Sequence, residues 1–353
     1  MNKVIYVAIA VVIAVVAAVV LFTFRPPTAP PITTSTAQTS SATAASSQPA
    51  QPTASNTSSQ PIIAMPECVE LTYPDQTPTY VDNFRYVMQI NMWNLKSANG
   101  TATLRYCNGT FYYRQELRDI VEKSPSAWVA GWPEIWIGYK PWNQPSTVGS
   151  PFPIQISNLL NSTMEVSVNY SVDIAPGNPL DLAFDIWVLK SPQEVASTSG
   201  PGPGDQEIMI WLYHQDTIPA GSQIGEVQIP IALNGTSVNA TFSVWRYEPA
   251  PGGFIQWEYI AFVLADNPKS ASIRFNLADF VRAAAKFTQI SNYKDLWMVD
   301  LEIGSEFGNP YVTNETYSWI LQLSINKNNI TNKILFLEGS NKYHLFDISR
   351  RKT

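Results

Sequence analysis

The sequence has few charged residues, two cysteines and two histidines. Asp, Glu, Lys and Arg make up 14% of its 353 residues, against about 25% in a typical globular protein. The 22 basic and 28 acidic residues give a net charge of −6. With no basic surplus or Lys/Arg-rich run to neutralise phosphates, this excludes a nucleic-acid binder. Two Cys and two His are too few for a four-ligand Cys/His zinc site, and neither His214 nor His344 adjoins a Gly-x-Ser-x-Gly elbow.

Aromatic residues are abundant instead. The chain has 11 Trp, 16 Tyr and 15 Phe, together 12% of its residues. Its potentially reactive side chains are mostly carboxylates. This combination favours sugar chemistry or sugar binding, because hydrolysis of a glycosidic bond uses paired carboxyl groups.

Residues 4–24 carry no charge and are almost wholly apolar. At about 1.5 Å per residue, a helix of this length spans roughly 30 Å, the hydrocarbon thickness of a bilayer. The apolar core of a signal peptide is shorter, at about 7–15 residues. We therefore expect residues 1–25 to form an uncleaved transmembrane anchor, with a cleaved signal as the alternative. Either one places the rest of the chain outside the cell, on its surface or secreted.

Residues 26–66 contain no charged residue and are rich in Ser, Thr, Ala, Gln and Pro. Such a stretch buries too little apolar surface to offset its chain entropy, so we expect a disordered linker. The chain also carries N-x-Ser/Thr sequons, which suit an exported glycoprotein: Asn56, Asn99, Asn108, Asn161, Asn169, Asn234, Asn239, Asn314 and Asn329. In that setting Cys68 and Cys107 favour a disulfide, with two free buried thiols as the alternative.

From Cys68 onward the apolar residues alternate with a period of two. Runs over 86–93, 164–170 and 228–233 recur between Gly, Pro and Asn breaks, which predicts an all-β sandwich or barrel. Residues 276–287 differ, because their apolar residues form a helical stripe behind a capping Asn276. We expect one helix packed on a two-sheet sandwich, and one domain over residues 67–349.

Three strands place acids, amides and indoles on one face. In residues 183–189, alternation puts Asp185 and Trp187 on one face of the strand and the apolar residues on the other. Alternation divides the side chains of residues 207–212 and 89–93 between two faces in the same way. The residues that share this outward face are Asp185, Trp187, Glu207, Met209, Trp211, Gln89, Asn91 and Trp93. Indole rings stack on the C–H faces of sugars, and carboxylates and amides bind sugar hydroxyls. The pattern therefore predicts a glycan-binding groove.

A fourth strand, within residues 296–307, adds Asp300, Glu302 and Glu306, which share one face if no bulge intervenes. Gly304 leaves room there for close approach of a ligand or backbone. Glycoside hydrolysis needs two carboxyls across the bond, one as nucleophile or base and one as proton donor. The candidates are Asp185, Glu207, Glu302 and Glu306, and periodicity alone does not pair them.

These motifs resemble those of glycoside hydrolase family 12. The resemblance rests on Glu207-Ile-Met-Ile-Trp211 with Asp185-Ile-Trp187 upstream and Gly304-Ser-Glu306 downstream. It also rests on Asn91-Met-Trp93 between the two cysteines, and on Trp132-Pro-Glu-Ile-Trp-Ile-Gly138. The matches run in family order over nearly all of residues 68–323. The low charge, apolar anchor and hydroxyl-rich linker resemble archaeal, acid-tolerant members of the family.

The resemblance implies a β-jelly roll with a long cleft across its concave sheet. It implies endo-acting hydrolysis of β-1,4-glucans with retention of configuration, by a mechanism that needs no metal or organic cofactor. We expect the protein to be a monomer, although the sequence leaves its oligomeric state open. Glu207 would be the nucleophile, Glu306 the acid/base, and Asp185 a supporting residue beside Glu207. The implied substrate-binding residues are Asn91, Trp93, Trp132, Trp187, Met209 and Trp211. Phe307 stands where the family commonly has Pro, so Glu302 stays an alternative acid/base.

Two other classes of function compete with the hydrolase. A non-catalytic, lectin-like surface protein would use the same Trp-lined groove, but it has less need of two opposed carboxyls. A structural cell-envelope protein would explain the sequons and linker, but not the Asp-x-Trp and Glu-x-Met-x-Trp strands. Among hydrolase substrates, cellulose, mixed-linkage glucan, xyloglucan and xylan all remain open.

Overall fold

The computed structural model describes residues 68–127, 129–249, 253 and 255–328. The expected anchor over residues 1–25, the expected linker over 26–66 and the sequons at Asn56 and Asn329 lie outside the described residues. Both ends of the domain expected over residues 67–349 lie outside them as well. Within the described ranges, no helix is both long and apolar enough to cross a bilayer.

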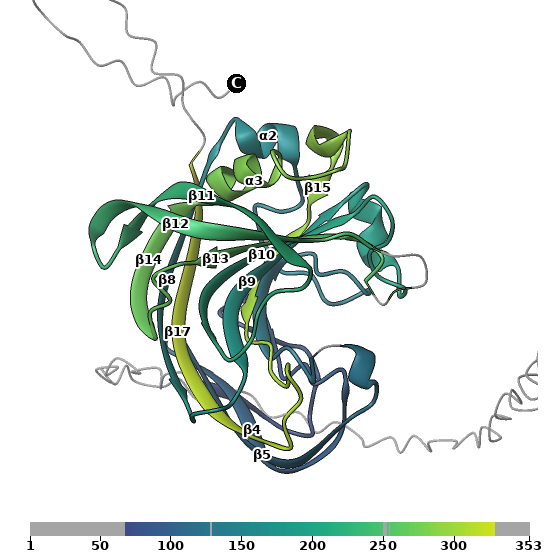
Figure 1. The fold of residues 1–353 in the computed structure, drawn as a ribbon, viewed down its shortest axis with the longest axis vertical. Helices are drawn as coiled ribbons and strands as arrows, with labels where there is room; N and C mark the ends of the chain where they lie inside the picture. The colour runs from purple at the N-terminus through teal and green to yellow at the C-terminus, as the bar shows by residue number, and fades with distance from the viewer. Residues whose placement is uncertain (1–67, 128, 250–252, 254, 329–353) are drawn as a thin grey trace, which may run out of the picture. The chain divides into compact units, whose positions relative to one another are not determined.

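Two curved layers of strands make up the fold (Figure 1). Neighbouring strands of the outer layer are, in order, β1 (Cys68–Thr72), β4 (Leu95–Cys107), β5 (Thr110–Glu122), β17 (Asn314–Asn328), β8 (Thr163–Ile174) and β14 (Ser270–Asn276). Those of the inner layer are β2 (Thr79–Val81), β3 (Tyr86–Gln89), β6 (Glu134–Gly138), β16 (Asp300–Gly304), β9 (Leu180–Leu189), β10 (Gln206–Gln215), β13 (Glu258–Leu264) and β12 (Thr236–Tyr247).

The strand β11 (Ser222–Leu233) pairs with both β12 and β14 and so joins the two layers. All these pairings are antiparallel except that of β10 with β13. The short strands β7 (Ile154–Gln155) and β15 (Trp297–Met298) pair with each other, and β15 continues onto β9. Helices are few in the described part: α2 (Ile156–Leu160), α3 (Leu277–Ala284) and three 3-10 turns at Pro125–Ala127, Pro192–Ala196 and Tyr293–Asp295.

The core lies between the layers, where alternation directs the apolar residues. Every second residue of β8 is buried, which is the pattern of a strand with one solvent face. In contrast β9 is buried throughout. Its Phe184, Ile186 and Val188 belong to the main core, while Trp187 belongs to a separate cluster on the other face. The inner layer therefore has a second, covered face opposite the core.

The helix predicted over residues 276–287 is confirmed as α3, one turn shorter at its C-terminal end. The Asn276 side chain accepts a hydrogen bond from the Ala278 amide at 3.3 Å, as expected for an N-cap. Phe280 packs edge-on against Phe242 and Phe275, with ring centroids 5.0 Å away in both cases. These contacts anchor the helix on the end of the sandwich.

The last predicted strand is interrupted. Residues 296–307 form β15 and β16 with a break between them, and β16 ends at Gly304, before Glu306. A Cβ on Gly304 would lie 2.5 Å from the carbonyl oxygen of Pro133, which confirms the predicted close approach of backbone. Likewise β3 ends at Gln89, so Asn91 and Trp93 follow the strand rather than belong to it. Boundaries such as these depend on neighbouring strands, which periodicity does not reveal.

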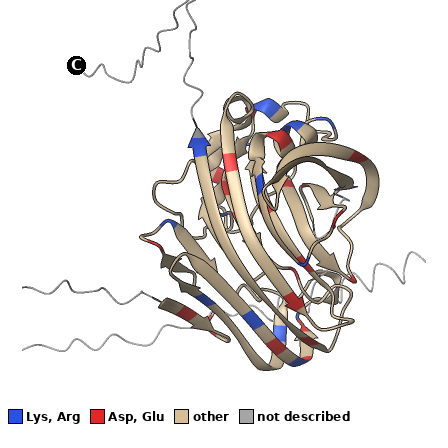
Figure 2. Cartoon of the chain, turned by 90° about the vertical axis from the view of Figure 1, so that its left-hand side faces the viewer, with Lys and Arg blue, Asp and Glu red and all other residues tan. Residues whose placement is uncertain are grey.

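The predicted disulfide between Cys68 and Cys107 is confirmed. The two residues lie opposite each other in the β1–β4 pairing, so the bond ties the start of the described part to the outer layer. In the view of Figure 2, basic and acidic positions both occur on the strands, and most positions are uncharged.

Candidate active site

A cavity of about 390 Å³ lies against the face of the inner layer that points away from the core. Its lining combines six aromatic rings with three carboxyl groups: Trp93, Trp132, Trp142, Trp187, Trp257 and Tyr259, with Asp185, Glu207 and Glu306. The amides of Gln89, Asn91, Gln144 and Asn309 and the amine of Lys140 also reach it. Such a cavity offers flat apolar surfaces beside hydrogen-bonding groups.

The three carboxyl groups come from neighbouring strands. Asp185 lies on β9 and Glu207 on β10, where Glu207 pairs with Trp187 and Met209 pairs with Asp185. The two acids are thus diagonal neighbours on one face of the pair. Glu306 follows β16, the strand on the other side of β9.

Glu207 is almost fully buried, and its Oε2 accepts a hydrogen bond from the indole Nε1 of Trp257 at 2.5 Å. Burial raises the pKa of Glu207 to about 8, and the charges of Glu306 and Glu302 act in the same direction. The bond from Trp257 and the positive charge of Lys140 lower this pKa. These two groups therefore favour the ionised form.

Glu306 is partly exposed to the cavity and is held by Asp181 through two backbone contacts. The Glu306 amide donates to Oδ1 of Asp181 at 3.0 Å, and the Asp181 amide donates to the Glu306 carbonyl at 3.2 Å. Burial raises the pKa of Glu306 well above its usual value, and the charge of Asp181 and a side-chain bond to it raise it further. Glu306 is therefore placed to keep a proton.

Asp185 has a raised pKa because of its burial and because of the nearby charges of Glu207 and Glu302. Its Oδ1 accepts a hydrogen bond from the Ile186 amide at 2.7 Å. The charge of Glu207 raises the pKa of Asp185, and the charge of Glu306 raises that of Glu207, so neighbouring groups lose their protons in sequence. A pH range therefore exists in which one is ionised while a neighbour is protonated.

Glu302, the alternative acid/base, has a different environment. It is fully buried and does not line the cavity. Burial would raise the pKa of Glu302, but the charge and hydrogen bond of Lys140, with bonds from Glu134 and Asp300, bring it below the usual value. An acid that stays ionised cannot deliver a proton, so this environment favours Glu306.

The predicted substrate-binding residues separate into two groups. Asn91, Trp93, Trp132 and Trp187 line the cavity. Met209 and Trp211 lie on the same face of β10 as Glu207 but do not line the cavity, and each is only 1% exposed. The Met209 sulfur contacts the Trp211 nitrogen at 3.4 Å and the Tyr259 hydroxyl at 3.3 Å, so these two side chains support the lining rather than form it.

Three lining aromatic residues, Trp142, Trp257 and Tyr259, were not predicted from the sequence. Trp142 and Trp257 cluster with the predicted Trp187, with ring centroids 4.9 Å apart for Trp142–Trp187, 6.2 Å for Trp142–Trp257 and 5.1 Å for Trp187–Trp257. Trp142 and Trp257 come from loops, where no period marks a face. Tyr259 pairs with Glu207 in the parallel β10–β13 register, and alternation along β13 was the signal that could have found it.

The Gly200-Pro-Gly-Pro-Gly204 loop bears on this cluster. A Cβ on Gly200 would lie 2.0 Å from Nε1 of Trp142, so the loop packs directly on a cavity-lining ring.

Within the described ranges, no group of three or more His, Cys, Asp or Glu residues is arranged to hold a metal ion.

Comparison with known proteins gives a family model and a set of structures. The model described as glycosyl hydrolase family 12 matches residues 84–324. None of the curated proteins matches. Similar solved structures include a family 12 xyloglucanase from Bacillus licheniformis, with a TM-score of 0.57 and 24% identity, covering 74% of this chain and all of that one.

A second similar structure is the endoglucanase cel12A from Rhodothermus marinus, with a TM-score of 0.55 and 21% identity, covering 74% of this chain and 99% of that one. At such identities the likeness concerns the fold. The two curved layers described above are thus a jelly-roll-like fold of the type found in these proteins.

Proposed function

The chain belongs to glycosyl hydrolase family 12, and from this premise we propose that it hydrolyses internal β-1,4-glycosidic bonds of glucans with retention of anomeric configuration. The observation that carries the proposal is that Glu207 and Glu306 line one aromatic-rich cavity, where their neighbours stabilise opposite protonation states. Trp257 favours the ionised form of Glu207, whereas Asp181 favours the protonated form of Glu306. A retaining hydrolase needs one group of each kind.

In the first step the Glu207 carboxylate attacks the anomeric carbon. The glycosidic C–O bond breaks as Glu306 gives its proton to the leaving oxygen, and a covalent glycosyl-enzyme forms on Glu207. In the second step Glu306, now a carboxylate, takes a proton from water as the water attacks the same carbon. The ester bond to Glu207 breaks and both side chains return to their starting states. This role requires the two carboxyl groups to lie about 5–5.5 Å apart.

The remaining cavity residues hold the sugar chain. Trp93, Trp132 and Trp187 supply stacking surfaces, and the Asn91 amide binds hydroxyls. Asp185 tunes the ionisation of Glu207 from the adjacent strand. Met209 and Trp211 act one layer below, by keeping the lining in place.

We further propose that the protein works as a monomer outside the cell, tethered through residues 4–24 or secreted. A disulfide between Cys68 and Cys107 supports an oxidising compartment. The low charge and hydroxyl-rich linker support kinship with archaeal, acid-tolerant members.

The test uses the full-length chain on carboxymethyl-cellulose, mixed-linkage β-glucan, xyloglucan and xylan, beside its Glu207→Gln variant. An endoglucanase lowers viscosity faster than it releases reducing ends, and the variant binds the polymer without cleaving it. Proton NMR of the first product should show the β-anomer. A variant as active as the wild type would remove Glu207 from the nucleophile role, and binding of a polymer without cleavage by the wild type would identify a lectin.

A further inference from the structure

Lys140 is an almost fully buried cation in the lining of the cavity. Its side chain is 6% exposed, and its ammonium group donates to Oε2 of Glu134 at 2.9 Å and to Oε2 of Glu302 at 2.5 Å. Both acids are fully buried. They lie on the paired strands β6 and β16, where Glu134 faces Gly304 in the register. One positive charge therefore links two strands of the inner layer.

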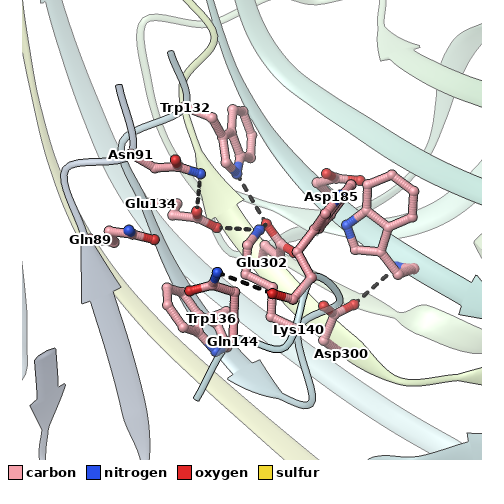
Figure 3. Close-up of polar contacts among 12 residues, drawn as sticks. Gln89, Asn91, Trp132, Glu134, Trp136, Lys140, Gln144, Asp185, Asp300 and Glu302 are labelled. Carbon is pink, nitrogen blue, oxygen red and sulfur yellow. Dashed lines mark hydrogen bonds and ion pairs between the residues drawn. The ribbon is translucent and has the colours of Figure 1, made fainter. Parts of the chain in front are cut away.

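Each of the two acids also binds a residue of the cavity wall. Oε1 of Glu134 accepts a hydrogen bond from Nδ2 of Asn91 at 2.8 Å. Oε2 of Glu302 accepts one from Nε1 of Trp132 at 3.1 Å. Figure 3 shows these contacts as one connected set, with Lys140 between the two acids and Asn91 and Trp132 at its ends.

The ammonium group supports the contact between Glu302 and Trp132 by keeping Glu302 ionised, whereas burial raises the pKa of Glu134 well above its usual value. Two carboxyl groups buried side by side repel each other when ionised, and each loses hydration. Lys140 opposes both effects for Glu302, whose pKa lies below its usual value despite burial. An ionised carboxylate is a stronger acceptor for the Trp132 indole than a neutral acid.

We propose that Lys140 is a positioning residue that orients Asn91 and Trp132 through Glu134 and Glu302, and so sets the affinity of the cavity for a glucan chain. This inference rests on the proposed function, since it concerns how the same cavity holds its substrate. Net stability alone is a weak reason for such a network, because apolar residues of equal volume often stabilise a core as well.

A double-mutant cycle separates positioning from general stability. Lys140→Met combined with Glu302→Gln removes one charge of each sign and leaves Glu134 as a neutral acid, since burial raises its pKa well above the usual value. Asn91→Ala removes the amide at one end of the network. The measurement is KM and kcat for cellohexaose, with melting followed by circular dichroism. Lys190→Met is the matched control, because this partly exposed lysine pairs with Asp205 and Glu194 away from the network.

We expect Asn91→Ala to raise KM about tenfold, as the loss of one hydrogen bond to a sugar would. The Lys140→Met/Glu302→Gln variant should raise it by a similar factor, with kcat changed much less. The triple variant should raise KM by clearly less than the product of the two separate factors, because the charge pair acts in part through the Asn91 amide. Lys190→Met should leave KM unchanged.

The inference is overturned if the Lys140→Met/Glu302→Gln variant is folded with a wild-type KM, or if its effect multiplies with that of Asn91→Ala to about a hundredfold. If the Lys140→Met/Glu302→Gln variant does not fold, Glu134→Gln takes its place in the cycle with Asn91→Ala, because Gln keeps the shape of the side chain. A wild-type KM, or an effect that multiplies with that of Asn91→Ala, would again overturn the inference. If the wild type cleaves no oligosaccharide, the hydrolase proposal fails. The same variants are then compared by their dissociation constants for cellohexaose instead of by KM. If the wild type does not bind it either, both proposals fail.

Discussion

The indole nitrogen of Trp257 lies 2.5 Å from Oε2 of Glu207. The same indole packs edge-on against Trp187 and Trp142, with ring centroids at 5.1 and 6.2 Å, so its N–H is held in a fixed direction. A donor aimed at a carboxylate favours the ionised form and opposes the burial that raises the pKa of Glu207 to about 8. One side chain thus joins the aromatic wall to the proposed nucleophile.

Trp257→Phe should lower kcat/KM by about ten- to a hundredfold, the value of a hydrogen bond to a charged group. Phe keeps most of the ring packing but removes the donor, so the pKa of Glu207 should rise. Because the nucleophile must be ionised, the acidic limb of the pH–rate profile should move to higher pH. The profile of kcat/KM against pH measures both effects.

Trp142→Phe is the control for that variant, since it removes an indole nitrogen from the same cluster but leaves the bond to Glu207 in place. The acidic limb of the kcat/KM profile of Trp142→Phe should lie at the same pH as in the wild type. Equal shifts in the two variants would show that the cluster as a whole, and not the bond from Trp257, governs the ionisation of Glu207.

Azide rescue should separate Glu306 from Glu302. Glu306→Ala should lose about 10²- to 10⁴-fold in kcat on a polymer, the usual contribution of a general acid. Azide should restore activity on an activated aryl glycoside, because the small anion replaces water and needs no general base. The glycosyl azide product, observed by NMR, should have the β-configuration.

Glu302→Ala should show no such rescue, because the carboxyl of Glu302 is bound to Lys140 and does not line the cavity. Instead this variant should lose stability by about 3–5 kcal/mol, since it leaves the buried ammonium with one partner fewer. Rescue by azide in Glu302→Ala alone would move the acid/base role to that residue.

Stability should be greater at mildly acidic than at alkaline pH. Burial raises the folded-state pKa of Asp181 to about 7 and that of Glu207 to about 8, and it raises those of Asp185, Glu306 and Glu315 well above the usual range. The folded state then binds more protons than the unfolded chain between about pH 4.5 and these values, so stability falls with rising pH by up to about 1.4 kcal/mol per pH unit for each group.

Glu315→Gln isolates one of these groups away from the cavity. Glu315 is 1% exposed and comes from the outer strand β17. Its replacement should make the fall in melting temperature between pH 5 and pH 8 shallower, whereas Glu226→Gln, on an exposed side chain, should leave it unchanged. A melting temperature that rises from pH 5 to pH 8 in the wild type would contradict the expected sign.

Much of the fold followed from alternation, because a strand sends every second side chain to the same face. The mostly β fold, the helix behind Asn276 and the disulfide were all predicted, and the structure has them. Periodicity also sorted Asp185 and Trp187 from their apolar neighbours, and both line the cavity. The helix and the sorting of side chains are relationships within one element, so the sequence carries them directly. The disulfide joins residues 39 positions apart, and it could be predicted because the chain has only two cysteines.

The contacts that distinguish the acids were beyond such reasoning. Lys140 and Glu302 are 162 residues apart, and Trp257 is 50 residues from Glu207. Their meeting depends on which strands pair and where loops return, and neither is encoded by a period. For the same reason periodicity placed Glu302 and Glu306 on one face, whereas the end of β16 at Gly304 separates a buried ion pair from a cavity-lining acid.

The contact between Asp181 and Glu306 gives the last prediction. The charge of Asp181 and a side-chain bond to it add to burial in raising the pKa of Glu306. Asp181→Asn removes the charge but keeps an oxygen that can accept the Glu306 amide. The pKa of Glu306 should therefore fall, and the proton donor should be lost at lower pH. The alkaline limb of kcat/KM should move to lower pH, while the acidic limb, which reports Glu207, moves much less. An alkaline limb unchanged in a folded Asp181→Asn variant would mean that another group holds the transferred proton.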